Sequence, residues 1–316
     1  MTAGMPRTQG EIVNTEVKRK IDVSTNVAKV STIYAATGLP ASGGKYKFGL
    51  PLDRMEHLAY FRASAERKPV EAKRVGDEGA FAMFEVKAKG ASDGTYTLKV
   101  FAVYTGVLTP YPKEITQLED QMVVYEDVLL APTPYKTAAQ STTVLLASET
   151  ASSIVDYSGN PPRVVKGDSI TYGPYYEAAP LVSQDRLRVH YVNHAPFAKA
   201  ESCLREIEVS SWGNIAVEEL YELVHDGAAL KGGFSRLDYG TRRSGYVPNP
   251  SFRMLNAVLP PSARDIYYRD RIGNISTSAI KQNKDNIELQ LATRYPIFGG
   301  WRTSWYQASF GTSQSR

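Results

Sequence analysis

The sequence predicts an all-β protein built from two successive sandwich-like domains with few short helices. Its dominant hydrophobic period is two, which places alternate side chains on opposite faces of a strand. Turn-forming residues separate the alternating runs, as in SGG at 42–44 and GNPP at 159–162. The chain also has 20 tyrosines, and aromatic rings favour strands.

Length and composition agree with two folded domains. The 316 residues suit two cores of about 150 residues each, and 42% hydrophobic with 22% charged residues excludes disordered and fibrous classes. The longest apolar run, 79–84, is far shorter than the roughly 20 residues of a membrane-spanning helix. We therefore expect no transmembrane segment in this chain. Residues 1–10 contain no apolar block of a secretory signal, and we expect them to be disordered.

Four segments show the strand pattern most clearly. In chain order they are residues 17–23, 95–104, 187–191 and 287–291. Helical periodicity is weak, and its best example is DRMEHLAYFRASAER at 53–67. There we expect a helix of one or two turns before the chain becomes extended.

A short internal echo suggests the domain division. Residues 17–24 read VKRKIDVS and residues 203–210 read CLREIEVS, an offset of 186 positions. Both begin a series of alternating segments, so we infer two domains of similar build. We place the first domain at 11–195, an incomplete second domain at 196–310, and a polar tail at 311–316.

Charge does not indicate a nucleic-acid partner. The 37 Lys and Arg residues against 33 Asp and Glu leave a net charge of only +4. The densest basic groups, KRK at 18–20 and Arg242-Arg243, are interpreted as solvated surface. The single cysteine, Cys203, lies in an alternating segment and is interpreted as a buried thiol.

Sequence motifs for catalysis are absent. The chain contains no GxGxxG, GxxxxGK[ST], HExxH, CxxC or GxSxG pattern. His190 and His194 would lie about 13 Å apart on a strand, too far to share one ion. The acidic pairs Glu218-Glu219 and Glu119-Asp120 are interpreted as solvated, because adjacent strand residues face opposite ways. We therefore expect no catalytic residue, no cofactor and no metal site.

Three tryptophans keep a binding function open. Trp212, Trp301 and Trp305 could stack on sugar rings, although tryptophans beside glycines more often pack at the corners of sheets. The alternative function is therefore a carbohydrate- or peptide-binding β module that uses Trp212, Trp301 or the tyrosine-rich segment 172–176.

One modification signal is specific. Asn274-Ile275-Ser276 is an N-glycosylation sequon in a polar stretch that has the composition of an exposed turn.

Several longer segments resemble the ribophorin I family, the large subunit 1 of the endoplasmic-reticulum oligosaccharyltransferase. They occur in the family's order from about residue 11 to about residue 310. They are VYTGVLTPYPKEITQ (103–117), SQDRLRVHYVN (183–193), IEVSSWGNIAVEE (207–219), GAALKGGFSRLDY (227–239), YYRDRIGNISTS (267–278) and RYPIFGGWRT (294–303).

This resemblance implies a non-catalytic subunit with two β-rich domains in the endoplasmic-reticulum lumen. The complex transfers a preassembled glycan from dolichyl diphosphate to Asn of Asn-x-Ser/Thr, and the family places that chemistry in another, multi-span subunit. The implied partners are that catalytic subunit, other subunits, nascent polypeptide and dolichyl-linked glycan, with translocon and ribosome nearby and no nucleic acid. The resemblance also supports Asn274 as a glycan site. Family members have a signal, a longer second domain and one membrane span, which this chain is expected to lack.

Overall fold

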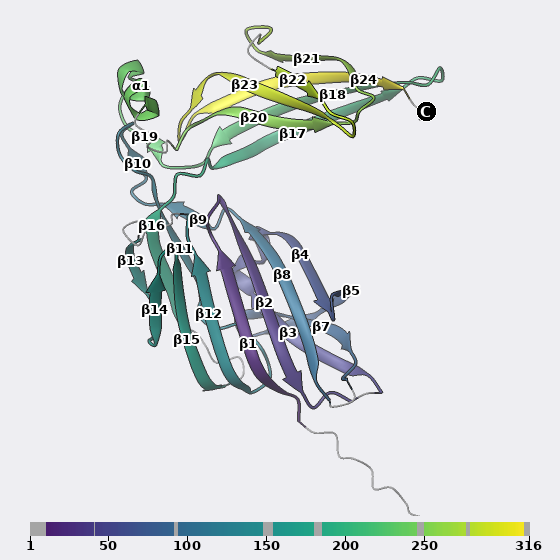
Figure 1. The fold of residues 1–316 in the computed structure, drawn as a ribbon, viewed down its shortest axis with the longest axis vertical. Coiled ribbons are helices and arrows are strands. Elements are labelled where there is room, and N and C mark those ends of the chain that lie inside the picture. The colour runs from purple at the N-terminus through teal and green to yellow at the C-terminus, as the bar shows by residue number, and fades with distance from the viewer. Residues whose placement is uncertain are drawn as a thin grey trace, which may run out of the picture. The chain divides into compact units, whose positions relative to one another are not determined.

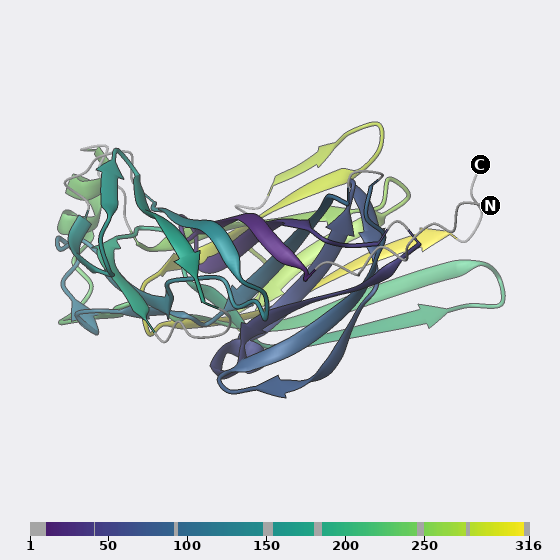
Figure 2. The same ribbon diagram turned by 90° about the horizontal axis from the view of Figure 1, so that it is seen from below.

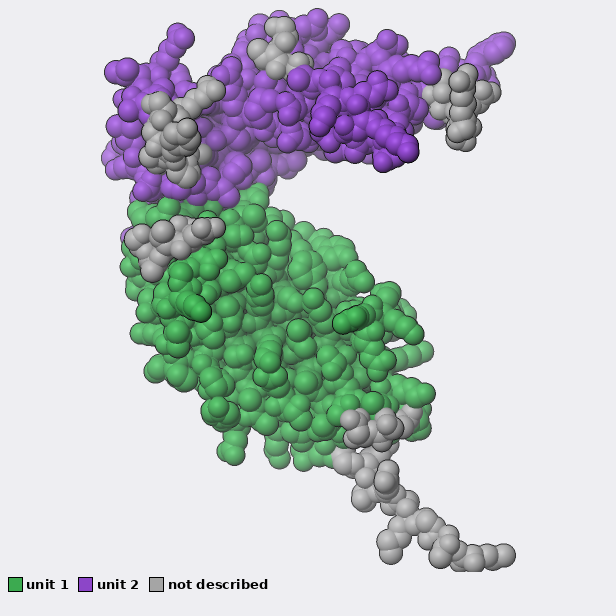
Figure 3. All heavy atoms as spheres, viewed as in Figure 1, with its two compact units in different colours: residues 1–109, 122–193 green, residues 110–121, 194–316 purple. Residues whose placement is uncertain are grey.

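The computed structural model describes residues 11–40, 42–91, 94–147, 154–179, 185–244, 250–275 and 279–312, and strands dominate them (Figure 1). With 65% strand and 4% helix, the prediction of an all-β fold is confirmed. The chain forms two compact units, shown in green and purple in Figure 3. Unit 1 comprises 1–109 and 122–193, and unit 2 comprises 110–121 and 194–316. The expected disorder at 1–10 lies outside the described residues.

Unit 1 is built on a mixed eight-stranded sheet and two smaller sheets. In spatial order the large sheet contains β14 (Arg163–Lys166), β15 (Ser169–Ala178), β12 (Thr137–Leu145), β1 (Val13–Asp22), β2 (Val27–Thr37), β8 (Tyr96–Thr105), β4 (Leu58–Ala65) and β5 (Lys68–Val70). The second sheet contains β13 (Ile154–Ser158), β16 (Arg186–Val192), β11 (Met122–Val128) and β9 (Leu108–Pro110). The third contains β3 (Gly44–Pro51), β7 (Phe81–Ala88) and β6 (Ala72–Glu78).

The core of unit 1 is rich in aromatic rings. Tyr34 on β2 packs against Tyr46 and Phe48 on β3, with ring centroids 6.0 and 6.1 Å away, and Phe48 stacks on Phe84 at 5.8 Å. These four side chains are at most 8% exposed. Because large rings remove much apolar area from water, these contacts help to stabilise the core of unit 1.

The helical pattern at 53–67 yields one short 3-10 helix, Leu52–His57, after which the chain extends as β4. β4 pairs antiparallel with β8, so Phe61 lies opposite Ala102 and Ala63 opposite Val100. Cross-strand packing of this kind exceeds the weak helical preference of the segment. The expectation of a turn or two before extension is confirmed.

Unit 2 contains a four-stranded sheet, a three-stranded sheet and a small parallel pair. The four-stranded sheet contains β17 (Ala198–Val209), β18 (Asn214–His225), β24 (Arg302–Thr312) and β21 (Arg264–Asp270). The three-stranded sheet contains β20 (Phe252–Leu259), β23 (Ile287–Ile297) and β22 (Ala279–Gln282). The pair joins β10 (Glu114–Ile115) to β19 (Ala229–Leu230), and a single α-helix in the described part, α1, spans Arg236–Ser244.

The core of unit 2 centres on Trp305 of β24. Its indole stacks on Tyr221 of β18 with centroids 5.0 Å apart, and Leu289 and Leu291 of β23 belong to the same buried cluster. Elsewhere in unit 2 the backbone at Gly299 closely approaches the backbone at Ala228. A Cβ on Gly299 would lie 1.8 Å from the Ala228 carbonyl oxygen. Only glycine fits there without movement of the backbone.

The echoed segments both lie in strands, one in each unit, but β1 is an interior strand of its sheet and β17 is an edge strand. Residues 17–22 belong to β1 and residues 203–209 to β17, and each of these strands pairs antiparallel with the next strand of the chain. Near the end of the chain, β24 continues through Gly311, opposite Ile215, to Thr312, opposite Asn214.

Candidate functional site

No group of three His, Cys, Asp or Glu side chains that could hold a metal ion occurs among the residues the structure describes. His190 lies on β16 in unit 1, whereas His194 belongs to unit 2 with its Nε2 3.4 Å from Asp120 Oδ1. The two histidines that the sequence spaces four apart thus have separate surroundings.

A buried ionic cluster lies inside unit 1. The guanidinium of Arg19 donates to the Asp127 carboxylate at 2.9 Å, Arg54 Nε is 3.7 Å from the same carboxylate, and the Tyr125 hydroxyl also donates to it. Arg19 is 4% exposed and Asp127 is 2% exposed. The interpretation of residues 18–20 as solvated is therefore wrong for Arg19, because its alternate position on β1 directs it into the core.

The charges of this cluster hold each other in place. Burial by itself would raise the pKa of Asp127, but Arg19 and Arg54 outweigh it and the pKa lies below its usual value. Burial raises the pKa of Tyr125 well above its usual value. A general acid or base works best with a pKa near the operating pH, and both groups are moved away from neutrality. The cluster is therefore suited to stabilising the fold rather than to moving protons.

A second buried carboxylate lies in unit 2. Glu219 on β18 is 6% exposed, accepts a hydrogen bond from Arg205 Nε, and accepts another from Gln307 Nε2 at 2.6 Å. The interpretation of Glu219 as solvated is wrong, because its face of the sheet is covered by the second sheet. Its neighbour Glu218 is only partly covered.

The three tryptophans have three different environments. Trp212 is 91% exposed in the tight turn between β17 and β18, while Trp305 is 7% exposed in the core. Figure 2 shows this hairpin as a long two-stranded arm.

Cys203 on β17 is exposed, so the prediction of a buried thiol is wrong. Alternation identifies its face correctly, but in the described part of the chain that face of β17 is left exposed.

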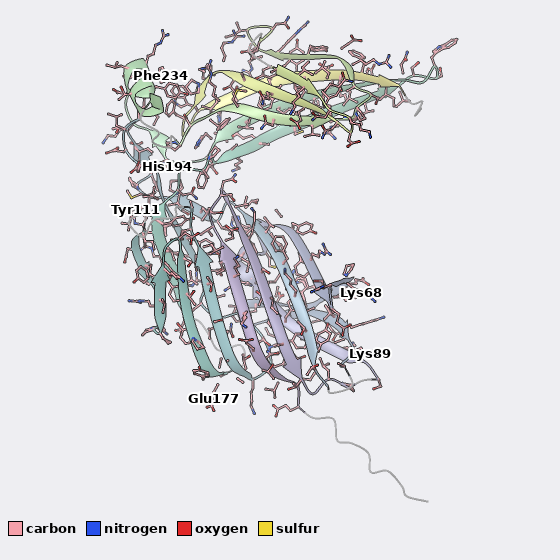
Figure 4. The ribbon with its side chains drawn as sticks, viewed as in Figure 1. Lys68, Lys89, Tyr111, Glu177, His194 and Phe234 are labelled. Carbon is pink, nitrogen blue, oxygen red and sulfur yellow. The ribbon has the colours of Figure 1, made fainter. Side chains whose placement is uncertain are left out.

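Trp301 is partly buried in an aromatic cluster. Phe298, Tyr295 and Phe234 surround it, with ring centroids 5.5, 5.9 and 6.3 Å away. Phe234 lies beside α1, as labelled in Figure 4, and also contacts Tyr239 of that helix at 5.9 Å. This arrangement is the corner packing that tryptophans beside glycines often adopt. In the other unit, the segment 172–176 includes Tyr172, which is buried, and Tyr176, which is 72% exposed.

Asn274 lies on the surface of unit 2 in a braced turn. Arg269 Nε donates to Asn274 Oδ1 at 2.6 Å, and Asp270 Oδ1 accepts the backbone N–H groups of Ile272 and Gly273. The hydrogen bond uses the side-chain oxygen, which leaves the amide nitrogen, the atom that would carry a glycan, unused by Arg269. Ser276 of the sequon lies outside the described residues.

Arg294 fixes that turn through Asp270. It donates to both carboxylate oxygens of Asp270 at 2.7 and 2.8 Å. This pair of hydrogen bonds lowers the pKa of Asp270 from 3.8 to about 2. The turn that presents Asn274 is therefore held by a charge-assisted contact to β23.

His225, at the end of β18, is buried. Its Nδ1 accepts the Gly227 backbone N–H at 3.1 Å, its Nε2 contacts the Pro250 carbonyl oxygen, and its ring stacks on Phe252. Burial lowers its pKa below 6.5. Both ring nitrogens are used in one tautomer, so this histidine supports the fold.

None of the helices in the described part of the chain combines the length and the hydropathy needed to cross a membrane.

The family model described as Ribophorin I matches residues 12–308. The chain is 37% identical to the Caenorhabditis elegans dolichyl-diphosphooligosaccharide–protein glycosyltransferase subunit 1, over 92% of this chain and 50% of that protein. It is 36% identical to subunit 1A of Arabidopsis thaliana, over 93% of this chain and 49% of that protein. The chain thus spans about half the length of these relatives.

Likeness to solved structures is weaker. A native yeast LTA4 hydrolase structure overlaps 61% of this chain and 30% of its own chain with a TM-score of 0.38 and 7% identity. A similarity of that size carries no argument about function.

Proposed function

Because the chain belongs to the ribophorin I family, as its sequence segments predict, we propose that it serves as a subunit of the oligosaccharyltransferase complex. The observation that carries the proposal is the family match over residues 12–308, together with relatives named as subunit 1 of that transferase. The reaction of the complex is N-glycosylation, the transfer of a preassembled glycan from dolichyl diphosphate to Asn in Asn-x-Ser/Thr.

Within the complex, the proposed role is structural rather than catalytic. The buried ionisable groups Asp127 and Glu219 are held by arginines, and His225 uses both ring nitrogens in contacts to backbone. These groups are used in contacts within the fold, which supports a structural role. The proposed scaffold holds a separate multi-span catalytic subunit and guides nascent polypeptide or glycan donor.

The proposed location is the lumen of the endoplasmic reticulum, with Asn274 carrying a glycan. The exposed, braced position of Asn274 supports this modification. Asn274→Gln should remove one glycan from protein made in microsomes, seen as a gain in gel mobility that endoglycosidase treatment of the original protein reproduces. The matched change Ser276→Ala, which removes the sequon but keeps Asn274, should give the same shift. An unchanged mobility in both variants would refute the assignment.

The direct test of the role is affinity purification from microsomes of the membrane-anchored form that the family has. We expect the multi-span transferase subunit to copurify, and depletion to lower sequon occupancy on secreted glycoproteins. Re-expression should restore that occupancy. Full occupancy after depletion, with no transferase in the purified sample, would contradict the proposal.

The second candidate function is a carbohydrate- or peptide-binding β module, favoured by the 91% exposure of Trp212. Binding of the isolated chain to a glycan array, lost in Trp212→Ala or Trp301→Ala with folding intact, would support it. Glycan binding that both variants retain would argue against these contacts.

A further inference from the structure

The two stacked sheets of unit 2 differ in width. The four-stranded sheet β17-β18-β24-β21 faces the three-stranded sheet β20-β23-β22, and residues of both sheets share one core. Strand register puts Ile207 of β17 on the same face as Val217 of β18, and Cys203 on the same face as Tyr221. This is the inner face, since Tyr221 packs on Trp305 in the core. Among the residues the structure describes, no strand covers the inner face of β17, whose residues 199–209 are all exposed.

The exposed apolar side chains of β17 mark the uncovered part of the inner face. Ile207 is 58% exposed and Val209 is 69% exposed, although both point to the side that the rest of the sheet buries. Beside them runs a groove of about 310 Å³ with a mostly aliphatic lining. Its lining includes Ile207, Ile215 and Val217 from the β17–β18 hairpin and Val258, Leu259 and Pro260 at the end of β20, together with Phe310 and the ion pair of Arg205 and Glu219. The groove therefore separates the overhanging strand β17 from β20.

β20 borders this groove with a free backbone edge. In the described part of its sheet β20 pairs with β23 alone, and β23 pairs on its other side with β22. The β22–β23 hairpin is closed by the Asn283 N–H and the Asn286 carbonyl oxygen at 2.9 Å. Hydrogen-bonded and non-hydrogen-bonded pairs alternate along an antiparallel ladder. Counting from the hydrogen-bonded pair Asn283–Asn286, Glu288 and Gln290 direct their backbone groups to β22.

The residues of β23 between them face β20. Ile287 and Leu289 direct their backbone N–H and C=O groups to Leu259 and Ala257, their partners in β20. The intervening residues of β20, Asn256 and Val258, must then direct their backbone groups to the free edge. Two donor and acceptor sets, two residues apart, thus lie along the free edge of β20, and Val258 also lines the groove.

We propose that the free edge of β20 is a docking site for an extended polypeptide segment, which adds as a fourth strand to the β20-β23-β22 sheet. Only an extended backbone supplies hydrogen-bonding groups at the two-residue spacing that Asn256 and Val258 present. The same segment, with apolar side chains at alternate positions, covers Ile207 and Val209 with its inner face. Its outward side chains are polar. The inference stands on the geometry of unit 2 and goes beyond membership of the transferase complex.

The probe is a fluorescein-labelled ten-residue peptide of alternating valine and threonine with lysine at both ends. Binding to the whole chain is measured by fluorescence anisotropy. Val258→Pro removes one N–H donor from the free edge, and its matched control is Ile280→Pro. Ile280 lies on β22, is 54% exposed, and pairs with Leu289, so it directs its N–H to the opposite free edge of the same sheet. We expect at least tenfold weaker binding for Val258→Pro and no change for Ile280→Pro.

A second pair of variants tests the floor of the groove without touching the edge. Ile207→Lys should weaken binding at least tenfold, whereas Leu204→Lys should not. Leu204 is 51% exposed on the same strand but faces the other way, opposite Leu220. Tryptophan fluorescence, to which the buried Trp305 contributes, reports whether unit 2 of each variant is folded. This second pair decides the matter if Val258→Pro unfolds unit 2.

Several outcomes would overturn the proposal. They are equal weakening by both members of each pair, no binding at millimolar peptide, and equal binding of a peptide of the same composition without alternation. A concentration-dependent dimer that Val258→Pro abolishes would identify the occupant as a second copy of this chain instead.

Discussion

Replacing Asp127 by alanine should destabilise unit 1 more than a typical single substitution does. The carboxylate accepts hydrogen bonds from Arg19 at 2.9 Å, from the Val128 backbone N–H at 2.7 Å and from the Tyr125 hydroxyl. Its removal leaves Arg19 buried without a counter-charge. Arg54, whose side chain is 11% exposed, loses the same partner.

Breaking a buried ion pair by removing one partner costs about 3–5 kcal/mol, since the remaining charge stays out of water. Two arginines share Asp127, so the upper part of that range, about 4–5 kcal/mol, is expected. For a unit of this size, each kcal/mol lowers the melting temperature by about 2–4 °C, which gives a loss of about 8–20 °C.

Hydrogen exchange of the β1 and β11 amides measures the effect in unit 1. The three tryptophans all lie in unit 2 at 212, 301 and 305, so tryptophan fluorescence during urea unfolding provides an internal control. Glu126→Ala is a matched control, because Glu126 neighbours Asp127 on β11 but is about half exposed. A loss below about 1 kcal/mol for Asp127→Ala, or an equal loss for Glu126→Ala, would refute the reasoning.

Three further predictions concern unit 2, and urea midpoints from tryptophan fluorescence check them. The Asp270 pKa of about 2 lies below its ordinary 3.8, so near pH 3 the unfolded chain binds more protons at this residue than the folded chain does. Stability should therefore fall as pH drops from about 4 to 2, and Asp270→Asn should make that fall smaller. Burial lowers the His225 pKa below 6.5, so stability should fall as pH drops below 6.5, and a flat profile there would contradict the assignment. Gly299→Ala should cost at least about 2 kcal/mol through its clash with the Ala228 carbonyl oxygen, whereas Gly240→Ala in α1, with open space around it, should gain about 1 kcal/mol.

Much of the fold could be predicted because its signal is local. The alternating segments at 17–23, 95–104, 187–191 and 287–291 correspond to β1, β8, β16 and β23, with only residues 23 and 95 outside the observed strands. The short helical turn before β4 was also expected. Segment 110–121 was harder, because nothing in its pattern indicates that β10 pairs with β19, more than 100 residues later.

The candidate surfaces were predicted less well. Arg19 looked like one of three solvated basic residues, and Glu219 like one of two solvated acids, but both are buried and paired. Cys203 was expected inside and is exposed. The sequence carried one usable signal for Arg19, its alternate position with Val17 and Ile21.

By itself, the sequence determined that the chain is made of strands, which side chains share a face of each strand, and which family it belongs to. These properties depend on a two-residue period and on segments of contiguous residues. The tertiary structure alone decided which faces are covered, which edges are free and where buried charges find partners. The physical reason is that alternation assigns a side chain to a face, whereas burial depends on whether a strand from elsewhere in the chain lies over that face.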